Sequence, residues 1–159
     1  MASDSIISMR QGDRLPIIAV AVEDDQARPL DMSATGTSAY MCFRMLDGSP
    51  LFPSGYPWSG PDWYEQSVLI ANGPGGVVSY DWSEIEADNV GIGIIELAVR
   101  VFLPGVGFGA SVYAPTDGHA YIVMRSRVYP IGTPIPGTYG ADKYGTGVYA
   151  DPTPVPITV

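Results

Sequence analysis

The chain has 159 residues, of which 46% are hydrophobic and only 16% are charged. The length predicts one domain with its own core, and the low charge argues against a disordered chain. Acidic residues outnumber basic ones by 17 to 8, and Lys143 is the only lysine. This balance argues against nucleic acid or an anionic membrane surface as the partner. The low charge also indicates that part of the surface faces another protein.

Short strands are predicted for the first part of the chain. We expect Ser5–Arg10 to be the first and Leu15–Val22 the second, with Pro16 indicating an edge position or a bulge. Apolar side chains alternate in Ser38–Met45, as in a half-buried strand. The side chains assigned to the core are Ala39, Met41, Phe43 and Met45.

Residues 51–64, here called the aromatic loop, are dense in proline, glycine and aromatic residues. No strand or helix period fits them, so we expect an ordered surface loop. Their aromatic side chains can pack on the domain's own core, contact another protein or stack on a sugar, and the sequence leaves these alternatives open. The candidate partner-binding residues in the loop are Phe52, Tyr56, Trp58, Trp63 and Tyr64.

The middle of the chain is predicted to form strands around one helical turn. After a strand at Glu65–Ala71, the β-branched run Val77–Trp82 predicts another strand. Ser83–Glu86 has the spacing of a capping box, in which the serine hydroxyl and the glutamate carboxylate each satisfy a free backbone N–H. Ile92–Phe102 is the longest apolar run; it is too short to span a bilayer and is predicted to be a buried strand.

The last predicted strands are Phe108–Ala114 and His119–Val128. Strands at this spacing, with turn signals between them, predict an all-β sandwich over residues 1–128. From residue 129 to residue 159 the composition shifts to proline, glycine and tyrosine, and prolines including Pro156 discourage sheet and helix alike. We interpret this segment as an extended C-terminal arm that docks on a neighbouring subunit through Tyr139, Tyr144 and Tyr149; the alternative is a disordered tail.

The sequence offers little for catalysis or metal binding. Cys42 is the only cysteine, which excludes an intrachain disulfide, and we expect it to be a small buried hydrophobe. His119 is the only histidine, and the chain lacks the nucleophile-elbow motif of hydrolases, so we expect His119 at a strand edge. Asp88 and Asn89 fit a solvated face better than a calcium loop. We therefore expect no catalytic residue, no metal site and no cofactor.

Several short motifs, in their order along the chain, resemble the immunoglobulin-like N-terminal domain of phage baseplate upper proteins and related virion proteins. The resemblance covers roughly residues 5–128. The residues that carry it are Gln11-Gly12-Asp13-Arg14-Leu15-Pro16, Pro29-Leu30-Asp31-Met32-Ser33, Ala39–Met45 with Asp47-Gly48, Gly76–Trp82, the strand containing Glu96, and Pro115-Thr116-Asp117-Gly118.

The resemblance implies an immunoglobulin-like β-sandwich with a structural, non-enzymatic role in a tailed-phage virion. Its partners would be other virion proteins and copies of itself. The position, whether in baseplate, neck, tail fibre or capsid surface, stays open. The N-terminal residues lack a secretory signal, so we expect synthesis in the host cytoplasm before incorporation into the virion. The alternatives are a carbohydrate-binding module for host recognition that uses residues 52–64, and a hydrolase that uses His119 or one carboxylate.

Overall fold

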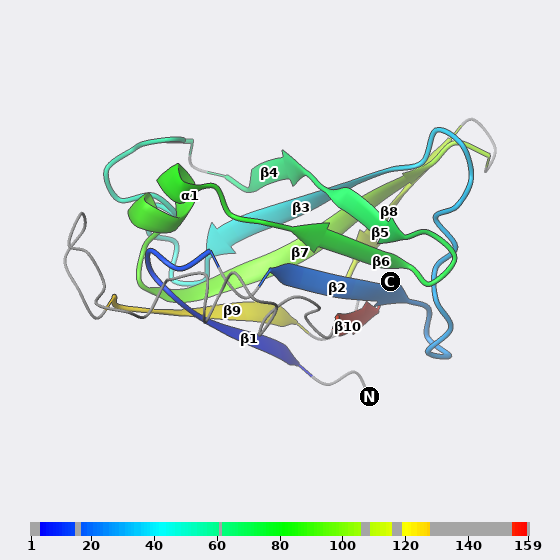
Figure 1. The fold of residues 1–159 in the computed structure, drawn as a ribbon, viewed down its shortest axis with the longest axis horizontal. Coiled ribbons are helices and arrows are strands. Elements are labelled where there is room, and N and C mark those ends of the chain that lie inside the picture. The colour runs from blue at the N-terminus through cyan, green and yellow to red at the C-terminus, as the bar shows by residue number, and fades with distance from the viewer. Residues whose placement is uncertain are drawn as a thin grey trace, which may run out of the picture.

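Two β-sheets pack face to face in the computed structural model, with a short helix at one end (Figure 1). The structure describes residues 4–14, 17–60, 62–105, 109–115, 119–127 and 154–158. Within these ranges the architecture is one six-stranded sheet, one four-stranded sheet and the single helix α1 (Glu84–Asn89). The prediction of an all-β sandwich with one short helical segment is confirmed.

The six-stranded sheet is built around two long central strands. Antiparallel pairing joins β3 and β7 over eight residue pairs, from Ser38 opposite Phe102 to Met45 opposite Ile95. β9 and β8 pair with successive halves of β7 on its other side, and β1 pairs in parallel with β9. The strands are β1 (Ser5–Arg10), β9 (Ala120–Arg125), β7 (Gly93–Leu103), β3 (Ser38–Met45), β4 (Tyr64–Ser67) and β8 (Ala110–Ala114).

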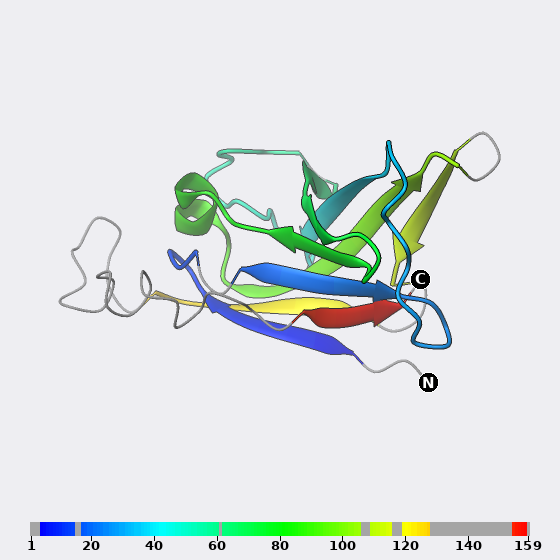
Figure 2. The ribbon, with the colours of Figure 1, turned by 45° about the vertical axis from the view of Figure 1, so that its right-hand side comes forward.

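The four-stranded sheet lies across the core from the first, as the rotated view shows (Figure 2). β2 and β6 form its centre, where Val20 is opposite Val78 in antiparallel register. The strands, in spatial order, are β10 (Val155–Thr158), β2 (Ile18–Glu23), β6 (Val77–Tyr80) and β5 (Leu69–Asn72).

Alternating side chains of the two sheets meet in the core. The predicted core face of β3 is confirmed: Ala39, Met41, Phe43 and Met45 are at most 4% exposed. The inward residues of β7 are equally buried, and the opposing sheet contributes Val20, Val22 and Val78. Phe43 also contacts Trp82, with ring centroids 4.9 Å apart. Each valine, leucine, isoleucine, methionine or phenylalanine among them stabilises the fold by about 1.5–3 kcal/mol relative to exposure.

The predicted strand Glu65–Ala71 is wrong in one respect, because it is two strands in different sheets. β4 belongs to the six-stranded sheet and β5 to the four-stranded sheet, and Val68 lies between them. The Val68 N–H donates to the Ala39 carbonyl at 3.0 Å, which ties the start of this crossing to β3. Tyr64 is buried on β4, whereas Ile70 packs against the core from β5 in the other sheet. The chain therefore passes from one sheet to the other between these two side chains.

The helix forms where the capping box is predicted. The Ser83 hydroxyl accepts from the Glu86 N–H at 3.2 Å, and the Glu86 carboxylate accepts from the Ser83 N–H at 2.8 Å. The helix is longer than the single predicted turn and ends at Asn89, after which Val90 is extended. It carries the chain from β6 in one sheet to β7 in the other.

Most of the predicted C-terminal arm lies outside the described residues, so its boundary at residue 128 stays a prediction. The last described residues form β10, which pairs in parallel with β2 and buries Ile157. The expectation that Pro156 discourages a strand is wrong at this position. β10 is an edge strand, where a missing N–H need not remove a ladder hydrogen bond.

Candidate functional site

The aromatic loop is anchored to the sandwich by two of its five candidate residues. Phe52 is 1% exposed and Tyr64 8% exposed, and their rings meet edge to face with centroids 5.0 Å apart. The Gly91 N–H donates to the Leu51 carbonyl at 2.7 Å, which ties the start of the loop to the segment after α1. For Phe52 and Tyr64 the alternative of packing on the domain's own core therefore applies.

The end of the loop is held by a buried carboxylate. Glu86 is 5% exposed, and its Oε1 accepts from the Tyr64 hydroxyl at 2.8 Å and from the Tyr80 hydroxyl. Its Oε2 accepts from the Ser83 N–H. One side chain of α1 therefore joins β4 of one sheet to β6 of the other. Sequence reasoning identified Glu86 only as a capping residue, because no local pattern links it to Tyr80, six residues away, or to Tyr64, 22 residues away.

The electrostatics of this cluster follow from its hydrogen bonds. Burial alone would raise the pKa of Glu86, but the bonds from Tyr80, Ser83 and Tyr64 together lower this pKa below its ordinary value. Burial, followed by the bond to the carboxylate, raises the pKa of both tyrosines. These shifts favour an ionised carboxylate beside neutral tyrosines, and the cluster joins the two sheets through hydrogen bonds.

The other three candidate residues of the loop are accessible to different degrees. Tyr56 is 58% exposed, so its ring is available to a partner. Trp58 is half-buried and packs on Tyr64, with centroids 5.5 Å apart. Trp63 is half-buried beneath the Arg44 guanidinium, which lies 4.3 Å from the indole centroid.

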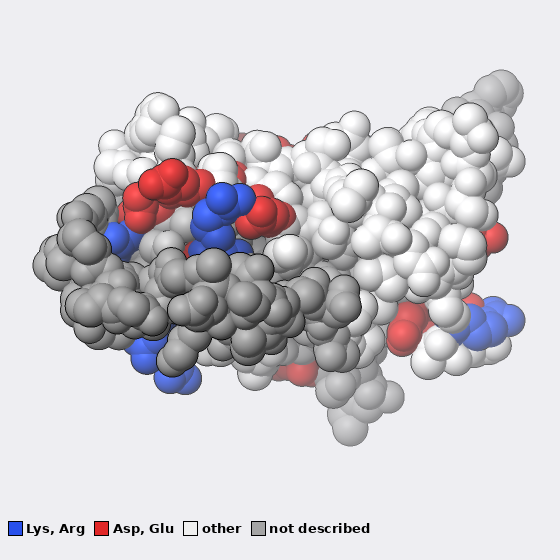
Figure 3. All heavy atoms as spheres, viewed as in Figure 1, with Lys and Arg blue, Asp and Glu red and all other residues white. Residues whose placement is uncertain are grey.

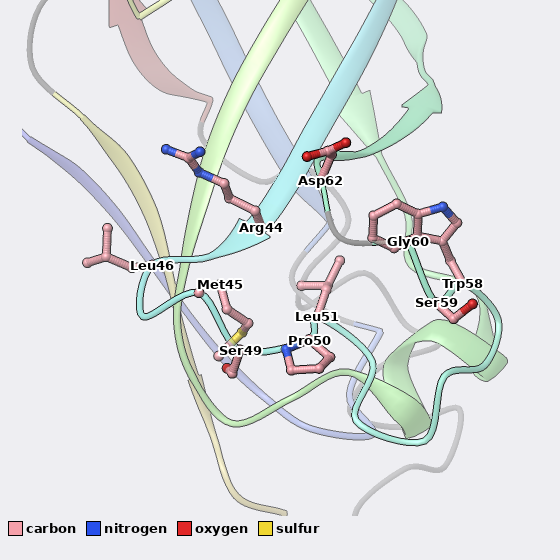
Figure 4. Close-up of a pocket in the computed structure, with 11 residues that line it drawn as sticks. Arg44, Met45, Leu46, Ser49, Pro50, Leu51, Trp58, Ser59, Gly60 and Asp62 are labelled. Carbon is pink, nitrogen blue, oxygen red and sulfur yellow. The ribbon is translucent and has the colours of Figure 1, made fainter.

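A hollow of about 560 Å³ opens between the aromatic loop and the end of β3. In Figure 4, Arg44 and Asp62 lie on one side of it, the Trp58 ring lies on another, and Leu51 points into the space between them. It thus combines a basic group, an acidic group and an aromatic ring at an open surface, which suits a polar ligand with an apolar face. Sequence reasoning found Trp58 but did not identify Arg44 or Asp62 as site residues, because only the folded chain brings them beside Trp58.

The outer face of the six-stranded sheet carries a row of polar side chains beside this hollow. Arg44 pairs with Glu96 at 2.7 Å, and His119 Nδ1 lies 3.6 Å from the same carboxylate. The His119 ring stacks on Tyr121 with centroids 5.4 Å apart. His119 lies directly before β9, as expected for a strand-edge residue.

Next to that row lies an exposed apolar cluster, here called the outer apolar patch. Leu46 is 48% exposed, Ile94 44% and Ile6 63%. Leu46 and Ile94 are neighbours, because the Leu46 N–H donates to the Ile94 carbonyl, and the half-buried Val123 of β9, opposite Ile94, belongs to the same patch. Ile6 is exposed on the same face two strands away, opposite Tyr121 of β9. No motif predicted the patch, since it is assembled from β1, β9, β7 and the end of β3.

The remaining sequence-based expectations concern Cys42, metal binding, membrane-spanning helices and the C-terminal tyrosines. Cys42 is 7% exposed, and burial, together with the neighbouring Glu65 carboxylate, raises the pKa of its thiol to about 12. In the described part of the chain, no group of three or more metal-ligating side chains is placed to hold an ion. Over the same residues, no helix is long and apolar enough to cross a membrane. The predicted contact residues Tyr139, Tyr144 and Tyr149 lie outside the described residues.

Comparisons with known proteins give similarity to solved structures alone. No family model matches the chain, and no curated protein matches it. Among solved structures, the N-terminal domain of phage TP901-1 ORF48 aligns with a TM-score of 0.47 at 11% sequence identity. The alignment covers 78% of this chain and 99% of that domain. At this level of similarity the match assigns no function to this chain.

Proposed function

We propose that this chain is a non-enzymatic structural component of a tailed-phage virion. It binds other virion proteins and copies of itself in the assembled particle. The observation that carries the proposal is the outer apolar patch, because exposed apolar side chains grouped on one sheet face mark a site of protein contact. The low charge of the chain agrees with it.

The distribution of charge on the opposite sheet supports the same role. In Figure 3 the charged side chains of this face gather mainly beside α1 and near the turn after β2, and the area over β5 and β6 is uncharged. Leu69 of β5 is 68% exposed there. Depletion of charge is the compositional mark of the centre of an interface.

The residues that carry the sequence resemblance also form the corners of this fold. Gly12 donates its N–H to the Ala87 carbonyl at 2.7 Å, and the Gln11 amide donates to the Val90 carbonyl at 2.8 Å. Arg14 Nε donates to the Trp82 carbonyl at 2.8 Å and pairs with Asp81. Two separate motifs of the resemblance therefore contact each other in this fold, which supports the proposal that draws on it.

Incorporation of an Ile94→Asp variant into purified particles tests the proposal. Ile94 is exposed on the outer face, so the variant should fold normally by circular dichroism and thermal unfolding, yet be lost from particles when they are probed by quantitative mass spectrometry. Ser111→Asp, at an exposed position of β8 in the same sheet, is the matched control and should be incorporated. Normal incorporation of a well-folded Ile94→Asp variant would refute a contact through this patch.

A second candidate function, carbohydrate binding for host recognition, is favoured by one observation. The hollow sets the Trp58 ring beside the Arg44 and Asp62 side chains, and an aromatic face with nearby charged hydrogen-bonding groups suits a sugar ring. Trp58→Ala and Trp63→Ala variants separate the two roles of the loop. Loss of a glycan-array signal with normal particle assembly would support sugar binding, whereas loss of assembly without any glycan signal would support a protein contact.

A further inference from the structure

The C-terminal strand β10 is a short segment that fills a slot at the edge of the sandwich. Its four residues pair in parallel with β2, where Val155 is opposite Val20 and Ile157 is opposite Val22. Ile157 is 4% exposed and belongs to the core, and Val155 packs against it. On the other side of the slot, the Ser5 hydroxyl of β1 donates to the Pro156 carbonyl at 2.6 Å. The slot between β2 and β1 therefore contacts the backbone of β10, the Ile157 side chain and the Pro156 carbonyl.

Pro156 limits the strand to this slot. Its carbonyl points toward β1, and along a strand the N–H and carbonyl of one residue point to the same side, so the missing N–H is also on the side of β1. The flanking Val155 and Ile157 then direct their backbone groups toward β2. The proline costs no hydrogen bond to β2, and it prevents β10 from joining the two sheets into one continuous ladder.

The covalent link between β10 and the rest of the sandwich is long. Residues 126–154, 29 in number, separate the end of β9 from the start of β10. At about 3.3 Å per residue such a segment reaches up to about 95 Å. A domain of this size has a radius of gyration of only about 14 Å. The link is therefore long enough for β10 to reach the slot of an adjacent molecule.

Without β10, the slot presents an unpaired strand edge. Val20 and Val22 are fully buried, and the backbone of β2 on that side pairs only with β10 among the described strands. An unpaired edge with apolar neighbours is a template for a strand from any chain. Because each contact of β10 is with β2, β1 or the core beside them, the same contacts form whichever copy supplies the strand.

We propose that β10 is exchanged between copies, so that the C-terminal strand of one copy occupies the β2–β1 slot of a second copy. Exchange of β10 would account for part of the self-association proposed above. Its function therefore rests on the proposed role in assembly. A dilute chain fills its own slot, since the tether supplies a high effective concentration. Copies held side by side reach comparable local concentrations, and exchange then links neighbours without the loss of any contact.

Disulfide trapping in the full chain tests the exchange. Ala21 and Pro156 are direct partners across β2 and β10, and both are at least partly exposed, so cysteines at these positions are placed to form a disulfide. All variants carry Cys42→Ala to remove the native thiol. The double variant Ala21→Cys/Pro156→Cys should oxidise to a crosslinked monomer when dilute. An equimolar mixture of the two single variants, one with a size tag, is concentrated to about 1 mM, oxidised and analysed on a non-reducing gel.

We expect the mixture to give the tagged–untagged disulfide dimer at high concentration, at least ten times above a matched mixture of Leu69→Cys with Pro156→Cys. Leu69 is exposed on β5 at the far edge of the same sheet and reports random collisions. A mixture that stays at this background while the double variant crosslinks would overturn the exchange. Failure of the double variant to crosslink would overturn the placement of β10 itself. Neither result bears on the incorporation of Ile94→Asp, so the assembly role can stand or fall separately.

Discussion

The buried carboxylate of Glu86 allows a quantitative prediction for Glu86→Gln. A glutamine keeps one oxygen for the tyrosine hydroxyls, but its NH₂ group then faces the Ser83 N–H, so the capping bond is lost and two charge-assisted bonds become neutral ones. Hydrogen bonds to charged groups contribute about 1.5–3 kcal/mol, against about 0.5–1.5 kcal/mol for neutral ones. We therefore expect the free energy of unfolding at pH 7 to fall by about 3–6 kcal/mol, and the melting temperature by roughly 6–24 °C.

Urea unfolding followed by tryptophan fluorescence measures this loss, and Glu84→Gln is the matched control. Glu84 is exposed in the first turn of the same helix and contributes under about 1 kcal/mol. The folded-state pKa of Glu86 is lowered from its ordinary value of 4.5, so its stabilisation is present above that value and is lost as the pH falls through the folded-state pKa. The gap between wild type and Glu86→Gln should shrink between pH 6 and pH 3. A gap that is unchanged at pH 3, or no larger than that of Glu84→Gln, would refute the reasoning.

Three further predictions concern the backbone, the thiol and the last strand. Gly76→Ala should cost about 2 kcal/mol or more, because Gly76 has φ +66° and an added Cβ would lie 2.6 Å from the Val22 carbonyl oxygen; Gly105→Ala, where a Cβ meets no described atom within 4 Å, should change the urea midpoint little. Cys42 should react with a disulfide reagent at pH 8 at least a hundredfold more slowly in the folded protein than in urea, since its pKa is about 12, and rapid labelling of the folded protein would contradict this burial. Ile157→Ala should lower the free energy of unfolding by about 2 kcal/mol, measured beside Thr158→Ala, and equal stability of the two variants would mean that β10 adds nothing to the core.

Local patterns in the sequence predicted the parts of the fold that depend on neighbouring residues. The alternation in Ser38–Met45 identified the core face of β3, and the serine–glutamate spacing identified the start of α1. The run from Ile92 to Phe102 matches β7 within one residue at each end. In each case the signal lies within a few neighbouring residues, so no knowledge of tertiary contacts was needed to predict the element.

The parts that sequence reasoning missed depend on contacts between distant segments. Alternation does not reveal that the chain changes sheets at Val68, because both short strands keep the same period on either side of it. The tyrosine pair on Glu86 joins residues 22 and 6 positions away, and the outer apolar patch collects side chains from β1, β3, β7 and β9. Proline generally disfavours β-sheets, and the sequence prediction applied this rule to Pro156. A strand accepts a proline when the missing N–H lies on the side that has no partner strand.

The contact between Ser5 and Pro156 joins two strands that are synthesised at very different times. β1 emerges from the ribosome first, but its partner β9 follows more than 100 residues later, and the strand that covers β2 comes last. At about 5–20 residues per second, β2 waits on the order of 10 s for β10. The two sheets can assemble around β3, β6 and β7 in that interval. Each nascent chain thus passes through a stage in which most of the two sheets can form while the β10 edge of β2 is still unpaired.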